Sequence, residues 1–262
     1  MDSQTRKQLI ALSQAFYRAQ AEAFDASRGH QAWPGWQRLA EWLPDESALR
    51  RPDPKPLRVL DIGCGNARFL RFLGDAGFRV DYTGVDSNAG LLEAARGRLA
   101  DRGSPDWRLV EQDFLASTQP GKELPDGPFD LIALMGVLHH VPGRDFRQDL
   151  LVAARRRLAE GGILALATWQ FAGRPRFAKR QMAWSDLDPI LGAPIDEAKL
   201  EAGDRLLRFG DDPEQPPRYC HQVSDAEFES WPDQLGLAPV AEYRADGAQG
   251  DLNRYWVLRH HE

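Results

Sequence analysis

The chain has 262 residues, of which 42% are hydrophobic, and a formal net charge of −6 at pH 7. This length suits one α/β domain with an insertion, and the negative charge argues against broad nonspecific nucleic-acid binding, which depends on phosphate neutralisation. No stretch approaches the ~18 continuous apolar residues of a membrane span, and the polar first residues do not resemble a signal peptide. Two cysteines, Cys64 and Cys220, fit a reducing compartment better than a disulfide framework. We therefore expect a cytoplasmic protein without membrane contact and, for lack of zinc-ligand spacing, without a metal site.

The N-terminal part predicts two helices and a stiff connector. Within residues 4–25, Leu9, Leu12, Phe16 and Ala19 recur at helical spacing. A second, shorter helix is expected over 34–43, after Trp33-Pro34. Alternating prolines in 51–56 predict an extended, polyproline-like linker.

The following part alternates between strand and helix patterns. Strands are expected over 58–62, 80–86, 107–111, 129–135 and 162–169, with helices over 66–76, 88–101 and 144–159. This rhythm is typical of a parallel, doubly wound α/β sheet. The Pro-rich and charged stretch 170–222 has few strand signals and predicts an inserted lid, followed by a helix over 225–235 and a hairpin formed by 238–245 and 252–259. We expect one domain composed of a helical cap and linker (1–56), a cofactor-binding core (57–169), the lid (170–222) and a C-terminal helix and hairpin (223–262).

A glycine turn follows the first predicted strand. The strand ends in Asp61, and Gly63 and Gly65 precede Asn66 and a helical pattern. Glycines let the backbone pass close to a ligand, and Asp61 can accept a hydrogen bond from a cationic group. A dinucleotide fingerprint would require a third glycine where Arg68 stands. The pattern therefore favours S-adenosylmethionine, whose amino-acid end carries an ammonium group.

Polar residues end the next strands as well. Asp86, about 20 residues after the glycines, is placed to accept both ribose hydroxyls, with Ser87 beside it; a helix N-cap is the alternative role. Asp113 can accept from the adenine amine while Phe114 packs on the ring, although an ordinary surface acid would look the same. Met135, at the end of the fourth strand, is expected to border the same ligand.

His139 and His140 follow that fourth strand. Ligands of open α/β sheets lie at the carboxyl ends of the strands, so a histidine here is a candidate for the reaction site. Because neighbouring side chains diverge in direction, we expect at most one to point inward, and His139 is our candidate.

Over about residues 56–170 these features resemble class I S-adenosylmethionine-dependent methyltransferases. The resemblance implies a seven-stranded, mostly parallel, Rossmann-like sheet and direct methyl displacement at the sulfonium. Most of the catalytic effect would then come from aligning the nucleophile with the methyl group.

Four blocks outside this core are similar to segments of the tRNA wobble-uridine carboxymethyl methyltransferases. They are residues 24–28 with Trp33-Pro34, then 203–209, 218–223 and 253–257. Ser27 stands where that family has threonine, the gap from Arg28 to Trp33 is one residue longer, and the 203–209 block lacks the family's proline. Eukaryotic members of that family work with a small zinc-binding activator subunit, so such a partner is conceivable here.

The resemblance implies methyl esterification of a carboxymethyl group. A carboxylate is already ionised and needs no strong base, but it needs cations or donors that orient it. Beside His139, the residues implied to act in catalysis are Arg28, His221 and Asn253. The residues implied to bind the acceptor are Trp33, Arg218, Tyr219 and Arg254. For each of them a surface ion pair or loop hydrogen bond is the alternative.

The tract 171–180 interleaves cations, among them Arg174 and Arg176, with two aromatic residues. This composition suits phosphate contacts and base stacking, but the acidic stretch 186–214 that follows would equally pair with it in a solvated lid. The sequence therefore predicts an S-adenosylmethionine-dependent methyltransferase acting on tRNA. A small-molecule methyltransferase and a noncatalytic protein that binds S-adenosylmethionine are the alternatives.

Overall fold

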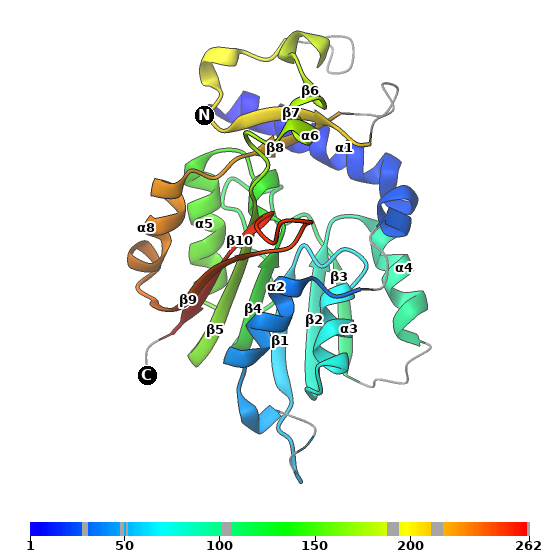
Figure 1. The fold of residues 1–262 in the computed structure, drawn as a ribbon, viewed down its shortest axis with the longest axis vertical. Coiled ribbons are helices and arrows are strands. Elements are labelled where there is room, and N and C mark those ends of the chain that lie inside the picture. The colour runs from blue at the N-terminus through cyan, green and yellow to red at the C-terminus, as the bar shows by residue number, and fades with distance from the viewer. Residues whose placement is uncertain are drawn as a thin grey trace.

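The computed structural model describes residues 1–27, 31–47, 50, 52–100, 106–187, 194–210 and 217–260. A seven-stranded sheet forms its centre (Figure 1). Its strands are β1 (Leu57–Ile62), β2 (Val80–Asp86), β3 (Trp107–Glu111), β4 (Phe129–Met135), β5 (Leu158–Trp169), β9 (Ala238–Ala245) and β10 (Asn253–Arg259). The order is β3-β2-β1-β4-β5-β10-β9, and β10 runs antiparallel to both neighbours. The predicted α/β fold class is confirmed, and the strand order reverses between β1 and β4, where such sheets bind ligands.

Helices cover both faces of this sheet. On one face lie α2 (Pro34–Leu39), α3 (Arg68–Asp75) and α4 (Ala89–Ala100), and on the other lie α5 (Arg144–Arg155) and α8 (Asp225–Leu235). Side chains of β1 alternate between the two layers: Val59 packs with the first group, and Leu60 and Ile62 with the second. Because both faces are covered, β4 and β5 are buried along most of their length.

A separate cap lies over the carboxyl ends of the strands, at the top of Figure 1. It consists of α1 (Ser3–Ser27) and a three-stranded antiparallel sheet of β6 (Gln181–Met182), β7 (Asp204–Arg208) and β8 (Pro217–His221). Leu9 and Leu12 of α1 pack against Leu206 and Tyr219 of this sheet. Phe16 is also buried, whereas Ala19 is exposed, so the apolar stripe of α1 ends at Phe16.

The sequence did not predict β7 and β8. Their apolar side chains are covered by α1, which lies far away in the sequence, so their stability depends on tertiary contacts rather than on a local pattern. The remaining elements are short: α6 (Pro175–Ala178) and the 3-10 helices Ala40–Trp42, Asp45–Ser47, Leu138–His140, Trp184–Leu187 and Glu197–Lys199. Across the described ranges, no helix has both the length and the apolar character to cross a membrane.

Candidate functional site

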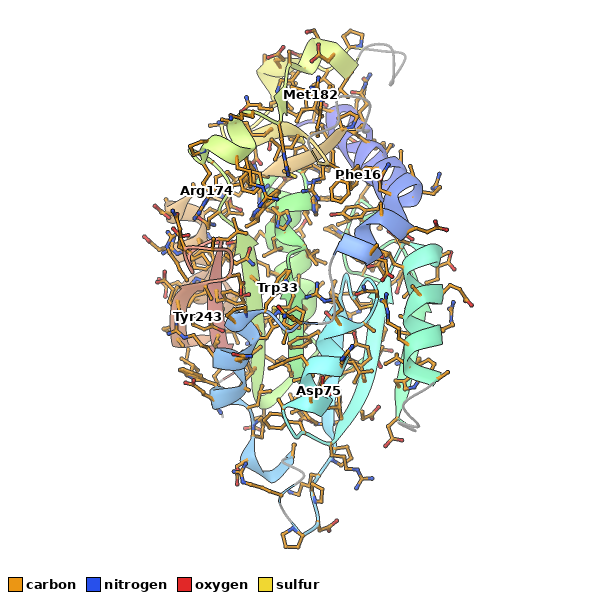
Figure 2. The ribbon with its side chains drawn as sticks, turned by 45° about the vertical axis from the view of Figure 1, so that its right-hand side comes forward. Phe16, Trp33, Asp75, Arg174, Met182 and Tyr243 are labelled. Carbon is orange, nitrogen blue, oxygen red and sulfur yellow. The ribbon has the colours of Figure 1, made fainter. Side chains whose placement is uncertain are left out.

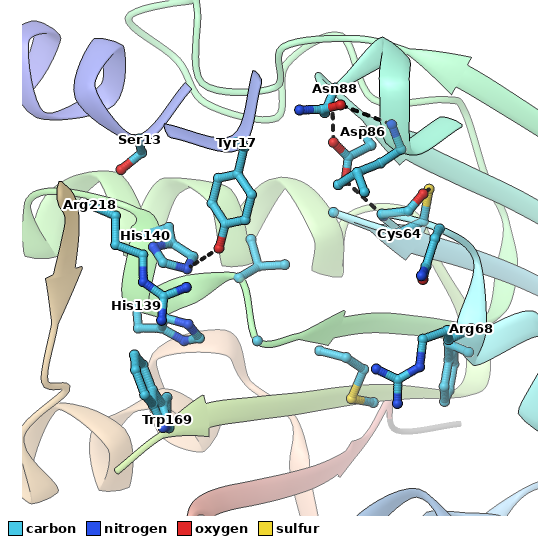
Figure 3. A pocket seen from close by; sticks show the side chains of 18 of the residues that line it. Ser13, Tyr17, Cys64, Arg68, Asp86, Asn88, His139, His140, Trp169 and Arg218 are labelled. Carbon is cyan, nitrogen blue, oxygen red and sulfur yellow. Dashed lines mark hydrogen bonds between the residues drawn. The ribbon is translucent and has the colours of Figure 1, made fainter. Parts of the chain in front are cut away.

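A cavity of about 1210 Å³ opens between the carboxyl ends of the central strands and the cap (Figure 3). The predicted site residues that line it are Trp33, Asp61, Gly63, Gly65, Asn66, Asp86, Ser87, Asp113, Phe114, Met135, His139, Arg176, Arg218 and Asn253. Four others do not line it: Arg174, Tyr219, His221 and Arg254. Arg28 lies outside the described residues.

The predicted glycine turn is present between β1 and α3. Gly63 and Gly65 have φ angles of +73° and +53°, a region that residues with a side chain rarely adopt. A Cβ on Gly63 would lie 2.5 Å from Cγ2 of Val137. The backbone N–H of Gly65 donates to Oδ2 of Asp86 at 2.8 Å, which fixes the turn against the end of β2.

Two acids border this turn, the half-buried Asp86 and the buried Asp61. Asp86 lines the cavity and accepts a second backbone hydrogen bond, from Asn88 at 2.9 Å. The alternative N-cap role belongs to Asn88 instead, whose Oδ1 accepts from the Leu91 N–H at 2.9 Å at the start of α4 (Ala89–Ala100). Burial raises the pKa of Asp86, although the hydrogen bonds from Asn88 and Gly65 oppose the shift. Burial also raises the pKa of Asp61 to about 7, against the lowering effect of the 2.6 Å hydrogen bond from the Tyr82 hydroxyl. A buried carboxyl of this kind favours a cationic ligand, because the ligand's charge restores the ionised form. The turn and these acids therefore fit the ammonium and ribose of S-adenosylmethionine.

Asp113 lies on the same side of the cavity and contacts the cap. Gln14 of α1 donates from Nε2 to Oδ2 of Asp113 at 2.6 Å, and the Leu115 N–H donates to Oδ1 at 3.0 Å. Phe114 lies next to it on the wall. The sequence did not predict that Gln14 lies at the site, because only the packing of α1 brings this side chain to the end of β3.

Arg68 also lines the cavity, at the position where a dinucleotide fingerprint has its third glycine. Its Nη2 donates to the Gln31 carbonyl at 2.8 Å, and its guanidinium lies 5.4 Å from the Trp36 ring and 5.8 Å from the Trp33 ring. Burial lowers the pKa of Arg68, as does the charge of Arg98. A half-buried cation at the start of α3 suits the carboxylate end of an amino-acid ligand.

Arg218 of β8 is the central cation of the opposite wall, and its side chain is only 8% exposed. Its guanidinium lies 5.1 Å from the Trp169 ring, 5.3 Å from Phe16 and 5.7 Å from Phe209. Its buried Nε has no hydrogen-bond partner, and among the residues that the structure describes no carboxylate pairs with it. A buried cation is costly unless it is paired, so this position favours an anionic ligand.

Both histidines line the cavity (Figure 3). The expectation that at most one points inward is wrong, because Leu138–His140 forms a 3-10 helix rather than an extended segment. His140 Nε2 lies 2.7 Å from the Tyr17 hydroxyl, and His140 Nδ1 lies 3.0 Å from the Tyr219 carbonyl oxygen. The His139 ring packs between His140 and Trp169. The sequence pattern predicted neither a site role for Tyr17 nor its contact with His140.

The block 218–223 reaches the site through Arg218 only. Side chains alternate along a strand, so Tyr219 and His221 lie on the face of β8 opposite Arg218. The Tyr219 hydroxyl donates to Oδ1 of Asp204 at 2.7 Å, and His221 Nδ1 lies 2.7 Å from the same oxygen. The structure thus corrects the acceptor-binding role of Tyr219 and the catalytic role of His221, because neither contacts the cavity.

These residues belong to a buried ion network that holds the cap on α5 and α8. Arg147 donates to Glu227 at 2.7 and 2.8 Å and to Glu201 at 3.0 Å, and His221 Nε2 lies 3.9 Å from Glu227. Glu201, Asp204 and His221 lie close enough together to bind a metal ion. However, Arg147, Tyr219 and the Glu201 N–H already donate to these carboxylates, so the network is satisfied by protein groups.

Two more predicted acceptor-binding residues are engaged elsewhere. Arg254 donates to Glu242 and Asp225 at 2.7 Å and to Glu229 at 3.0 Å, in an ion cluster between β10, β9 and α8. Arg174 donates to the carbonyls of Gln170 and Asp251. The structure corrects the acceptor-binding roles of Arg254 and Arg174, because their guanidinium groups bind other protein groups and stabilise the fold. Asn253 stays on the cavity wall and donates to Asp246 at 2.7 Å.

Residues 60–164 match a family described as "Methyltransferase domain". Over 112 residues the chain is 30% identical to a ubiquinone biosynthesis O-methyltransferase of Thiobacillus denitrificans, covering 42% of this chain and 44% of that protein. It is 32% identical over 162 residues to a ubiquinone/menaquinone biosynthesis C-methyltransferase of Methylobacterium nodulans, covering 61% and 58%. The chain thus spans less than two thirds of the length of these curated relatives.

Solved structures share the fold at low identity. A S-adenosylmethionine-dependent methyltransferase of Methanosarcina mazei has a TM-score of 0.59 at 17% identity, covering 88% of this chain and 99% of its own. A 1,6-didemethyltoxoflavin-N1-methyltransferase of Burkholderia thailandensis, solved with S-adenosylhomocysteine, has a TM-score of 0.56 at 16% identity, covering 98% and 91%. These structures confirm the predicted methyltransferase fold, and the matched domain agrees with the predicted enzyme class and cofactor. The relatives named here do not support the narrower resemblance to wobble-uridine enzymes.

Proposed function

We propose, starting from the methyltransferase domain in residues 60–164, that this chain methylates a small organic acceptor that carries a carboxylate or similar anion. The observation that carries the proposal is Arg218, a buried cation on the cavity wall without a carboxylate partner among the described residues. S-adenosylmethionine supplies the methyl group, and the glycine turn with Asp61 and Asp86 would hold it.

The distribution of charge along the cavity supports this orientation. The wall near β1 to β3 contributes four acids, namely Asp61, Asp86, Glu111 and Asp113, beside the cation Arg68 at the start of α3. The opposite wall contributes the cations Arg176 and Arg180, from α6 and the residues after it, and Arg218 of β8. A cationic cofactor on the first side and an anionic acceptor on the second would each meet complementary charge.

The cap favours a small acceptor. Helix α1 is tied to the core by Gln14 with Asp113, on the cavity wall, and by Arg6 with Asp145 at 2.6 Å. Trp169 and Phe177 of the acceptor wall pack on each other with ring centroids 4.7 Å apart. Such a wall suits an aromatic or otherwise apolar body that carries one anionic group.

Two measurements test the proposal: the binding of aromatic acids to the protein loaded with S-adenosylhomocysteine, and the methylation of these acids when S-adenosylmethionine is supplied. We expect Arg218→Met to weaken the binding of benzoates about 10- to 100-fold, the range for a hydrogen-bonded ion pair, with unchanged affinity for S-adenosylhomocysteine. Arg38→Met is the matched control, because Arg38 also stacks on an aromatic ring, Tyr243, but does not line the cavity. Equal binding of acids and their uncharged amides would contradict the proposal.

A carboxymethyluridine in tRNA is the second candidate. Arg176, Phe177 and Arg180 of the basic tract line the cavity, and they could contact a phosphate and a base. Incubating the protein with labelled S-adenosylmethionine and purified tRNA containing carboxymethyluridine separates the candidates. A labelled ester nucleoside, together with no methylation of small acids, would replace the first proposal by the second.

A further inference from the structure

We propose that Tyr17 and His140 together accept the proton of the acceptor, so that the methylated atom is a hydroxyl oxygen and the anion at Arg218 is an anchor. This inference rests on the proposed function, because it concerns the acceptor held in the same cavity. Tyr17 comes from α1 and His140 from the 3-10 helix after β4, and both line the cavity. Figure 3 shows the Tyr17 hydroxyl directed at the His140 ring, beside Arg218 and His139.

The hydrogen bonds of His140 define which nitrogen is the base. Nδ1 lies 3.0 Å from the Tyr219 backbone carbonyl oxygen, which can only accept, so Nδ1 carries the hydrogen. In the neutral ring Nε2 is then the acceptor, and it receives the Tyr17 hydroxyl at 2.7 Å. The pair is thus prepared to pass a proton from the Tyr17 oxygen to His140.

The groups around the His140 ring come from three elements: Tyr17 from α1, His139 from the 3-10 helix, and Cys220 and Arg218 from β8. His139 lies 4.2 Å away between ring centroids, and Cys220 Sγ of β8 lies 4.0 Å from Nδ1. Burial raises the pKa of the Cys220 thiol to about 11, so that group stays protonated near neutral pH. Arg218 of the same strand contributes the nearby positive charge (Figure 3).

The acceptor hydroxyl gives its proton to the Tyr17 oxygen while the Tyr17 proton moves to Nε2 of His140. The acceptor oxygen forms a bond to the methyl carbon as the carbon–sulfur bond breaks, and the electron pair of that bond stays on sulfur as a neutral thioether. His140 ends as an imidazolium whose Nδ1–H still donates to the Tyr219 carbonyl, and it releases the proton to solvent after the product leaves.

The Tyr17–His140 pair assists methylation only where the acceptor atom carries a proton that must be removed. A carboxylate is already ionised at neutral pH and needs no base, whereas an ordinary phenol or alcohol is protonated and a poor nucleophile. A positioned base accelerates such a transfer about 10²- to 10⁴-fold. The acceptor class that uses both Arg218 and the pair is therefore a hydroxy acid with an aromatic or apolar body.

The experiment compares two probes, 4-hydroxybenzoate and 3-nitro-4-hydroxybenzoate, whose phenol is already ionised at neutral pH. We expect the wild-type protein to methylate the phenol oxygen of both. Tyr17→Phe keeps the ring and removes the hydroxyl, so it should lower kcat about 100-fold with the first probe and less than about threefold with the second. Binding of both probes to the S-adenosylhomocysteine-loaded protein, measured by calorimetry, should be unchanged.

A second variant and a control guard against a purely structural effect. His140→Gln should show the same dependence on the probe. Tyr243→Phe also removes one hydroxyl, which donates to the Gly35 carbonyl outside the cavity, and it should leave both rates unchanged. An equal loss with both probes would mean that Tyr17 only supports the fold, and it would overturn the inference.

The outcomes separate this inference from the proposed function. Bound probes that are not methylated, or a methyl ester as product, would overturn the hydroxyl inference and leave the anionic acceptor site standing. Failure of the wild-type protein to bind either benzoate would overturn the proposed function, and the inference would fall with it.

Discussion

The cofactor wall and the acceptor wall of the cavity are assembled in different ways. The cofactor wall comes from consecutive strand ends between Asp61 and Phe114, where backbone geometry and buried acids form the site. The acceptor wall combines Tyr17 of α1, His140 after β4 and Arg218 of β8, which lie far apart in the sequence. Figure 2 shows the same division: Phe16 and Met182 lie in the cap, above Trp33 and Asp75 of the core. The cofactor wall therefore depends on local turns, whereas the acceptor wall depends on how the cap is attached.

The largest expected effect is a loss of unfolding free energy when the ion network that attaches the cap to α5 and α8 is broken. Replacing Arg147 by Met would leave the buried Glu227 and the half-buried Glu201 without their cation. Breaking a buried ion pair in this way costs about 3–5 kcal/mol of unfolding free energy. Burial alone would raise the pKa of Glu227, but hydrogen bonds from His221 and Arg147 outweigh it and lower that pKa to about 2, as expected for a strongly paired acid. Denaturant unfolding measures the loss, and Arg144→Met, an exposed position on the same helix, should change stability by less than about 0.5 kcal/mol.

The next effect concerns the cofactor wall alone. Asp86→Ala removes the acceptor of two backbone N–H groups and the proposed ribose partner, so we expect the affinity for S-adenosylhomocysteine to fall about 100-fold. Calorimetry measures this affinity. Asp81→Ala, an exposed position on the same strand, should leave it unchanged, and an unaltered Kd in Asp86→Ala would contradict the ribose assignment.

A smaller effect on stability and on cofactor affinity is expected when the pH changes. The pKa of Asp61 is raised from 3.8 to about 7, mainly by burial, so the free protein keeps a proton that the unfolded chain loses near pH 4. This raised acid makes the free protein less stable as pH rises from about 4 to 7, because the unfolded state binds fewer protons there. A bound ammonium group favours the ionised carboxyl, so cofactor affinity should rise about tenfold per pH unit up to about 7 and then level off. Calorimetry between pH 5.5 and 8 tests this, and Asp61→Asn should remove most of the slope; a wild-type affinity independent of pH would contradict it.

The smallest effect is expected at Arg254, which the sequence assigned to the acceptor. Its guanidinium pairs with Glu242, Asp225 and Glu229, outside the cavity. Arg254→Gln should therefore leave the binding of benzoates within about twofold of wild type while it lowers the free energy of unfolding by up to about 1 kcal/mol. A loss of benzoate binding as large as that of Arg218→Met would instead support the acceptor-binding role that the sequence predicted for Arg254.

The sequence by itself determined the sheet, the glycine turn and the positions of Asp61, Asp86 and Asp113, because strand ends and positive φ angles leave local patterns. It also identified Arg218, but it could not separate that residue from Tyr219 and His221, since a resemblance does not state which face of a strand each side chain occupies. Only the tertiary structure decided the acceptor wall. The contact of Tyr17 with His140, and the lack of a carboxylate paired with Arg218 among the described residues, depend on α1 and a small sheet packing over the strand ends. Such contacts between distant segments leave no local pattern in the chain.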